Sequence, residues 1–210
     1  MNSTARVGLA QHQGRRKEHS SMWKLYSLTT VLIVIISSCA ASADAVRFSA
    51  MGPGVSELTL TGGYGENHKI PDTTDQRFQF TVAKFRRARF KSDRSQVGYE
   101  FALRRSEDAG GEWSVSSMIC YRRYFLQRGH TALGLDLGIG LEMDKEIMNG
   151  QGSNLNFTER AGLTLQYGIN ENAALNLVYS YSHTSNAGLS DPNRGINTSS
   201  LSLGYSWYIW

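Results

Sequence analysis

The stretch LGLDLGIGL at residues 133–141 alternates large apolar side chains with glycine or aspartate at every second position. Successive side chains of a β-strand point to opposite faces, so this alternation predicts a strand with one apolar face and one small or polar face. The same pattern recurs at residues 175–181 and 201–209. No helical periodicity of useful length follows residue 44, so the rest of the chain is predicted to be all-β.

Weaker alternation predicts five more strands, which brings the total to eight. They are expected at residues 58–64, 78–82, 97–103, 115–125 and 161–167.

The spacers between these strands alternate in length. The long ones are polar and rich in Gly, Asn, Asp and Glu, at residues 66–76, 105–112, 143–154 and 186–195. The shorter ones lie at residues 88–95, 126–130 and 169–172. Long and short connections around eight amphipathic strands are typical of an antiparallel, up-and-down transmembrane β-barrel of the outer membrane. We therefore expect the long spacers to be extracellular loops and both ends of the barrel domain to lie in the periplasm.

The alternative fold is a secreted eight-stranded soluble barrel of the lipocalin type, with its apolar face inward. The non-apolar positions of the strands are Gly, Ser, Asn and Thr more often than Lys and Glu. Small polar residues suit a narrow packed lumen better than a soluble exterior, which favours the membrane barrel. Asp136 and Glu100 are then lumen charges, with Arg104 and Arg122 as candidate partners.

Composition agrees with this interpretation. The chain has 210 residues, 40% of them hydrophobic, and its mean hydropathy is −0.35. These values exclude a helical membrane bundle, which needs several apolar runs of about 20 residues. They do not exclude a β-barrel, because alternation hides its apolar positions. The 21 glycines and 3 prolines suit strands and turns better than disorder.

A leader precedes the barrel. Residues 25–36, LYSLTTVLIVII, form the only strongly apolar run, with Lys24 before it and SSCAASA at 37–43 after it. A charged start, a short apolar run and an Ala-x-Ala ending predict a secretory signal peptide. We expect residues 1–43 to be an N-terminal extension plus signal peptide that is removed, and residues 44–210 to be a single barrel domain. The alternatives are a retained anchor helix and lipoprotein processing at Cys39.

The charge of the chain belongs to this leader. The net charge is +4, and residues 1–43 hold five basic residues against one acidic residue. The predicted mature domain is therefore neutral, and nothing electrostatic in it indicates nucleic-acid binding. It keeps one cysteine, Cys120, so an internal disulfide is excluded.

Three polar residues near the chain end form a candidate catalytic group. His183 and Ser185 continue the apolar register of residues 175–181, so both are expected on the lipid-facing surface, about 7 Å apart. If the 186–195 loop is symmetric, Asn197 lies beside His183 across the strand pair. A hydroxyl, a base and a residue that orients the base follow the logic of a catalytic triad. A site facing the membrane implies a lipid substrate.

The residues around this group resemble the outer-membrane lipid A 3-O-deacylases of the PagL type. The resemblance lies in HTSNAGL at 183–189, PNRGI at 192–196, SNLNF at 153–157 followed by Glu159, and the GLDLGIG strand at 134–140. It covers residues 130–210 in motifs and the earlier strands only in size and pattern.

The resemblance implies hydrolysis of the ester-linked 3-hydroxyacyl chain of lipid A in lipopolysaccharide, without metal or other cofactor. Ser185 is expected to be the nucleophile and His183 the general base. The oxyanion is expected to be held by Asn186, the Gly188 N–H and Asn193, which also lie in good turn sequences.

One position departs from the family pattern, since the characterised member has a glutamate where this chain has Asn197. A carboxylate stabilises an imidazolium, whereas an amide only orients the ring, although Cys-His-Asn sites are active. With a turn centred near residue 170, Glu159 is expected diagonal to His183, where it could supply or supplement the acid.

Two other functions stay open. Outer-membrane phospholipase A has a similar His-x-Ser-Asn motif followed by an asparagine, but its barrel has more strands and it dimerises around calcium. A non-catalytic structural barrel is the second alternative. Exposed aromatics such as Tyr179, Tyr181, Tyr205 and Trp207 are expected to form an interfacial girdle rather than walls of an acyl groove. The oligomeric state is left open, a homodimer included.

Overall fold

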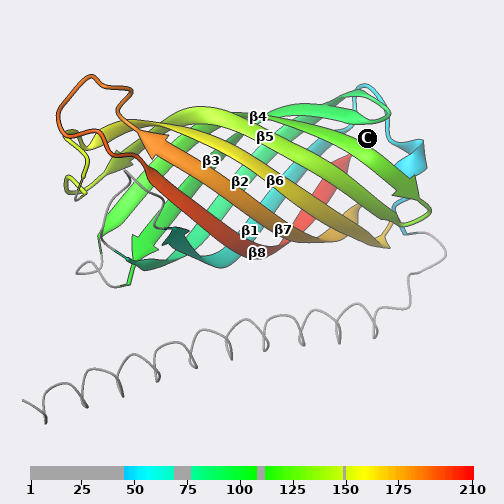
Figure 1. The fold of residues 1–210 in the computed structure, drawn as a ribbon. Coiled ribbons are helices and arrows are strands. Elements are labelled where there is room, and N and C mark those ends of the chain that lie inside the picture. The colour runs from blue at the N-terminus through cyan, green and yellow to red at the C-terminus, as the bar shows by residue number, and fades with distance from the viewer. Residues whose placement is uncertain (1–44, 69–76, 108–111, 149) are drawn as a thin grey trace, which may run out of the picture. The chain divides into compact units, whose positions relative to one another are not determined.

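Eight antiparallel strands close into a single barrel in the order β1 to β8, with β8 pairing back onto β1 (Figure 1). The computed structural model describes residues 45–68, 77–107, 112–148 and 150–210. The predicted leader at residues 1–43, with its alternatives, lies outside the described residues. Within those residues, no helical segment is long and apolar enough to cross a membrane.

The strands are longer than the alternating patterns from which they were predicted. Their bounds are β1 Ser56–His68, β2 Gln79–Ser92, β3 Ser95–Ser106, β4 Trp113–Arg128, β5 Thr131–Asp144, β6 Leu155–Asn170, β7 Ala173–Ser185 and β8 Ile196–Ile209. A single 3₁₀ turn, η1 Phe48–Ala50, precedes β1. The prediction of eight up-and-down strands is confirmed.

Connections at the two ends of the barrel differ in length as expected. The turns after β2, β4 and β6 contain two residues each, and they share their end of the barrel with the start of β1 and the end of β8. The connections after β1, β3, β5 and β7 are long and lie at the other end. In outer-membrane barrels short turns are periplasmic and long loops extracellular, which orients this chain.

The two faces of the sheet are inverted relative to a soluble protein. Outward side chains are large and apolar, with Tyr99 62%, Ile139 60% and Phe101 57% exposed. The lumen instead holds buried charged and amide side chains. An apolar exterior of this extent fits a bilayer, and the soluble lipocalin-type alternative is excluded.

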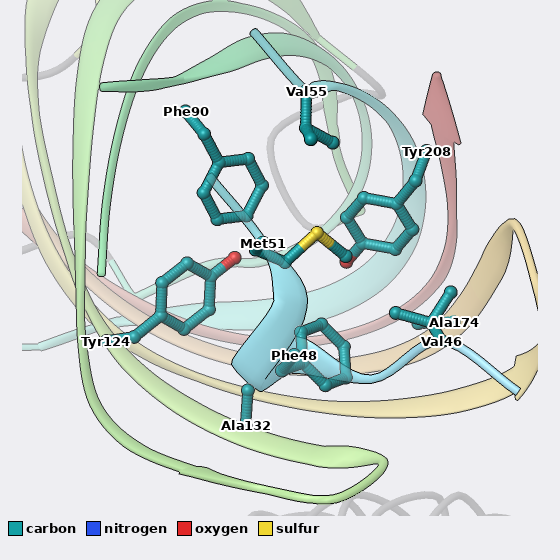
Figure 2. Packing of buried hydrophobic residues seen from close by; sticks show 9 residues of the cluster. All are labelled: Val46, Phe48, Met51, Val55, Phe90, Tyr124, Ala132, Ala174 and Tyr208. Atoms are coloured by element: carbon teal, nitrogen blue, oxygen red, sulfur yellow. The ribbon is translucent and has the colours of Figure 1, made fainter. Parts of the chain in front are cut away.

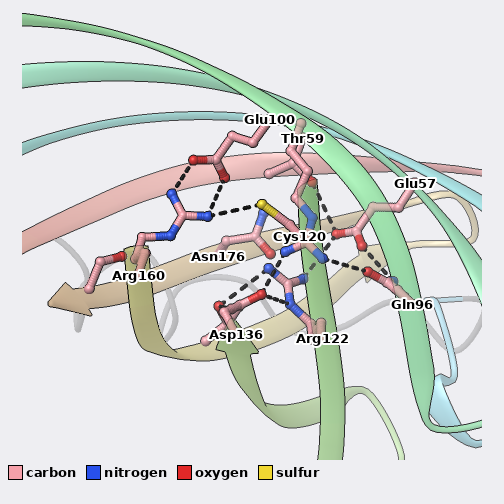
Figure 3. A network of polar contacts seen from close by, with 12 residues as sticks. Glu57, Thr59, Gln96, Glu100, Cys120, Arg122, Asp136, Arg160 and Asn176 are labelled. Carbon is pink, nitrogen blue, oxygen red and sulfur yellow. Dashed lines mark hydrogen bonds and ion pairs between the residues drawn. The ribbon is translucent and has the colours of Figure 1, made fainter. Parts of the chain in front are cut away.

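The lumen charges form a connected network (Figure 3). Asp136 accepts hydrogen bonds from Arg122 Nε at 2.8 Å and Arg86 Nη1 at 2.6 Å, and Arg122 also lies 3.5 Å from Glu57. The predicted pairing of Asp136 with Arg122 is therefore confirmed.

Glu100 pairs with Arg160 rather than with either predicted arginine. Arg104 instead contacts Glu142 and Asp144 near the extracellular end. Glu100 and Arg160 meet across the lumen from β3 and β6. Which charges meet there depends on how the closed barrel curves, not on pairing along one strand.

The segment before β1 closes the periplasmic end of the barrel (Figure 2). Phe48 is fully buried and meets the ring of Tyr208 edge-on at 5.9 Å. Backbone hydrogen bonds anchor the segment, from Val46 N to Asn170 O at 2.7 Å and from Phe48 N to Gly129 O at 3.1 Å. The rest of the apolar cluster is Met51, Val55, Phe90, Tyr124, Ala132 and Ala174.

Candidate active site

Strand register places the three candidate polar residues of β6, β7 and β8 in one row. His183 is paired with Glu159 on one side and with Asn197 on the other. The predicted pairing of His183 with Asn197 is confirmed. Glu159 lies directly opposite His183 and not diagonal to it, because the β6–β7 turn is at residues 171–172 rather than near residue 170.

The imidazole of His183 is oriented by Asn197. Nδ1 of the ring and Oδ1 of the amide are 2.9 Å apart, and Asn197 is only 7% exposed. An amide oxygen can only accept, so Nδ1 carries the proton. In the neutral ring Nε2 is then the acceptor, which is the state that a general base requires.

Ser185 lies on the same outward face as His183, two residues further along β7. Both are half-buried, while Thr184 between them is buried in the lumen and donates to Thr158 Oγ1. The expected outward placement is therefore found. Among the contacts of the described residues, none is a hydrogen bond between Ser185 and the imidazole. Such bonds are often long without substrate and shorten when it binds.

Gly195 lies close to Cε1 of the same ring. Its φ is +64°, and a Cβ built on it would lie 2.6 Å from Cε1 of His183 and 3.3 Å from Nε2. Both the left-handed backbone and the close approach require glycine here. His183 is thus fixed by the Asn197 amide at Nδ1 and confined by the backbone of Gly195 near Cε1.

The three expected oxyanion residues build the loop after β7. The Asn186 side chain, 1% exposed, donates to Ser190 O at 2.8 Å and accepts from Gly188 N at 2.9 Å. The Asn186 backbone N–H donates to Asn193 Oδ1 at 3.0 Å. Asn186 and the Gly188 N–H are therefore engaged within the loop, whereas the amide nitrogen of the exposed Asn193 has no partner among the described contacts.

The β5–β6 connection supports this loop from the side. Gln151 forms an isolated bridge with Asn193, and Arg194 N donates to Gly150 O at 2.9 Å. Gly152 lies so close to Asp191 that a Cβ there would meet the carbonyl oxygen at 2.4 Å. These contacts were not predicted from the sequence, because they join two loops rather than two strands.

A hollow of about 430 Å³ adjoins the row on the outer surface. Register places Leu137, Ala161 and Tyr181 side by side on β5, β6 and β7, next to the row of Ile139, Glu159 and His183. The small Ala161 side chain leaves the space between its larger neighbours. Tyr181 therefore lines a groove, which the girdle interpretation did not predict.

His68 extends the row onto β1, since it pairs with Asn197 across the closure of the barrel. Its Nε2 lies 2.7 Å from Ser199 Oγ, and its ring stacks on Tyr181 with centroids 6.2 Å apart. His68 was not predicted as part of the site, because the alternating pattern predicted a first strand that ends at Tyr64, four residues before the observed end of β1. The only available signal was that His68 continues the even-numbered register.

Among the described residues, no group of three or more His, Cys, Asp or Glu side chains gathers as a metal site.

Comparisons with known proteins agree with this fold. The outer membrane enzyme PagL has a TM-score of 0.51 and 22% sequence identity over 72% of this chain and 98% of its own. Neisserial surface protein A (NspA) has a TM-score of 0.60 and 10% identity over 73% of this chain and 98% of its own. At these identities the likeness shows the fold alone. No curated protein matches the chain.

The family comparison goes further than the fold. The model of the family described as Lipid A 3-O-deacylase (PagL) matches residues 72–206, a range that includes β2 to β7, most of β8 and every residue of the predicted catalytic group. The chain belongs to the lipid A 3-O-deacylase (PagL) family of outer-membrane β-barrel enzymes.

Proposed function

We propose that this chain removes the ester-linked 3-hydroxyacyl chain of lipid A by a serine-hydrolase mechanism, with Ser185 as nucleophile and His183 as general base. The observation that carries the proposal is the ordered imidazole of His183. Asn197 holds the proton on Nδ1, which leaves Nε2 as the acceptor on the face shared with Ser185.

In the first half-reaction, His183 Nε2 takes the Ser185 proton while Oγ attacks the ester carbonyl carbon. The tetrahedral intermediate then collapses. The C–O bond to the sugar breaks, and the leaving sugar oxygen takes the proton from the imidazolium. The deacylated lipid leaves and the 3-hydroxyacyl group stays on Ser185 as an ester.

In the second half-reaction, the imidazole deprotonates a water molecule, which attacks the acyl carbonyl. Oγ of Ser185 leaves and recovers its proton, and a 3-hydroxy fatty acid is released. No metal ion takes part in the steps proposed.

We assign different weights to the oxyanion donors. We propose that the side-chain amide of Asn193 donates directly to the oxyanion. Its oxygen accepts from the Asn186 N–H, and its amide nitrogen remains available to the substrate. Asn186 and the Gly188 N–H would have to exchange their internal hydrogen bonds to reach substrate. A donor of this kind typically contributes about 3 kcal/mol to transition-state stabilisation.

The hollow beside the row is the proposed site for the acyl chain. It opens on the outer surface next to His183 and is lined by Leu137, Ile139, Ala161 and Tyr181. Its volume lies within the usual range of small-molecule sites, and its apolar walls match a hydrocarbon chain.

Mass spectrometry of lipid A from cells that express the protein tests the proposal. The wild type should produce lipid A that lacks one 3-hydroxyacyl chain, and Ser185→Ala should not. Ser190→Ala, a nearby serine whose backbone carbonyl holds the loop, should behave like the wild type. Lysophospholipid accumulation with unchanged lipid A would refute the proposal in favour of a phospholipase. Unmodified lipid A and phospholipids at high protein levels would favour a non-catalytic barrel.

A further inference from the structure

A group of exposed cations lies at the periplasmic ends of β2, β3 and β4. We call this group the basic belt, and its members are Arg87, Arg89, Lys91, Arg94, Arg123 and Arg128. Arg94 and Arg128 belong to the periplasmic turn region. The other four are on the outward register of β2 or β4 and therefore face the membrane.

The protein supplies little negative charge to the basic belt. Asp93 is the acidic residue within it, 3.6 Å from Arg94, and both are exposed. In the part of the chain that the structure describes, no ion pair reaches Arg87, Arg89, Lys91 or Arg123.

The members of the belt lie close enough to repel one another. Arg87, Arg89 and Lys91 follow at every second position of β2, so neighbours on this face are about 7 Å apart. Arg123 pairs with Ser95 at the start of β3, and on its other side Ser95 pairs with Ser92, the residue that follows Lys91. Like charges at this spacing next to hydrocarbon are unfavourable unless anions lie between them.

The other half of the barrel carries no such charges. The outward residues of β5, β7 and β8 are apolar, aromatic or neutral polar, and on β6 the only charged one is Glu159 at the extracellular end. The basic belt is therefore not a feature repeated around the periplasmic rim. It is confined to one side, away from the strands that carry the catalytic group.

Apolar and aromatic side chains complete the surface. Tyr99 and Val97 on β3 are paired with Arg87 and Arg89, and both are exposed, as is Tyr121 on β4. Long cationic side chains next to apolar surface can extend their charged ends toward the headgroup layer. The combination suits a ligand with an anionic headgroup and acyl chains.

We propose that the basic belt binds an anionic phospholipid of the periplasmic leaflet. The negatively charged phosphodiester would lie between Arg89, Lys91 and Arg123. The acyl chains would lie along the outward apolar face of β2 to β4. This site is separate from the deacylase site in position, ligand and leaflet.

Native mass spectrometry of the lipid-stripped protein in neutral detergent tests this site. The protein is offered equal amounts of phosphatidylglycerol and phosphatidylcholine. The wild type should retain phosphatidylglycerol in roughly tenfold excess, because each cation near an anionic headgroup strengthens the attraction. The variant Arg87→Gln, Arg89→Gln, Lys91→Gln, Arg123→Gln should retain the two lipids equally.

A matched control removes four exposed cations from the extracellular end: Arg77→Gln, Arg105→Gln, Lys145→Gln and Arg194→Gln. It should keep the preference. Equal retention by the wild type, or loss of preference in both variants, overturns the proposal. The difference in electrophoretic mobility between unheated and heated samples checks that each variant is folded. Deacylation by the basic-belt variant in detergent should equal that of the wild type, so failure of this site and failure of the proposed function give different results.

Discussion

The imidazole of His183 is fixed by contacts from β8 and from the loop between β7 and β8. Asn197 holds one ring nitrogen, and the Gly195 backbone lies close to Cε1 of the ring. A catalytic base needs such fixation, because displacement by about 1 Å can cost two orders of magnitude in rate. Two substitutions separate the contact at Nδ1 from the contact near Cε1.

Gly195→Ala should abolish most deacylation while the barrel stays folded. The new methyl group would lie 2.6 Å from Cε1 of His183 and displace the ring, and the left-handed φ adds about 1 kcal/mol of strain. Gly129→Ala is the control, since Gly129 has φ +55° and open space around the Cβ position. Lipid A mass spectrometry and urea unfolding of both variants distinguish ring displacement from backbone strain. Equal loss of activity in both would contradict the ring argument.

Asn197→Ala should lower kcat by about two orders of magnitude, because the ring loses the acceptor that fixes its tautomer. Glu159→Gln should lower kcat only several-fold. Its carboxylate is exposed and makes no hydrogen bond to the ring among the described contacts, so it acts through its charge on the imidazolium. Single-turnover rates on purified lipid A measure both. If Glu159→Gln leaves the rate unchanged while Asn197→Ala abolishes it, Glu159 does not supplement the acid.

At the scale of strands, the sequence predicted the β7–β8 pair better than the β6–β7 pair. The loop after β7 is nearly symmetric. The assumption of a symmetric 186–195 loop therefore paired Asn197 correctly with His183. The β6–β7 turn lies at residues 171–172, beyond the expected centre near residue 170, and the irregularity between Gly168 and Asn170 shifts the register by one residue, so that Glu159 is paired with His183. Periodicity fixes which face a residue occupies, but a bulge changes its partner.

Contacts between elements distant in sequence were harder to predict. His68 meets the site only because β1 closes onto β8, and Gln151 meets Asn193 only because two loops fold together. Neither depends on local periodicity. The fold class, the outward face and the candidate catalytic residues followed from local pattern and from the family motif, whereas the surrounding support required the closed barrel.

The groove across β5, β6 and β7 should be sensitive to the size of residue 161. Ala161→Trp should fill the space between Leu137 and Tyr181 and lower kcat/KM most for substrates with long 3-hydroxyacyl chains. Leu163→Trp is the control, because Leu163 faces outward on the same strand but does not line the hollow. Chain lengths of the released 3-hydroxy fatty acids give the readout. If Ala161→Trp releases 3-hydroxy fatty acids of the same chain lengths as the wild type, the acyl chain does not bind in this groove.

At the scale of the whole molecule, charges replace the apolar core in the central lumen. Glu57, Arg86, Arg122 and Asp136 form a buried group with no net charge, and hydrogen-bonding neighbours such as Gln96 complete it. A balanced group of this kind tolerates burial because each ion is desolvated against a partner. Apolar packing is left to the periplasmic end, around Phe48.

Removing one member should therefore destabilise the barrel through charge imbalance. Arg122→Met leaves Glu57 and Asp136 with Arg86 as the remaining cation of this group and should lower the free energy of unfolding by roughly 3–5 kcal/mol. In the double variant Arg122→Met, Asp136→Asn, Glu57 and Arg86 are the remaining charges of this group. The group is neutral again, and part of the lost stability should be recovered. Urea unfolding in detergent micelles, followed by tryptophan fluorescence, measures all three proteins. A double variant less stable than Arg122→Met would show that individual hydrogen bonds, rather than balance of charge, stabilise the lumen.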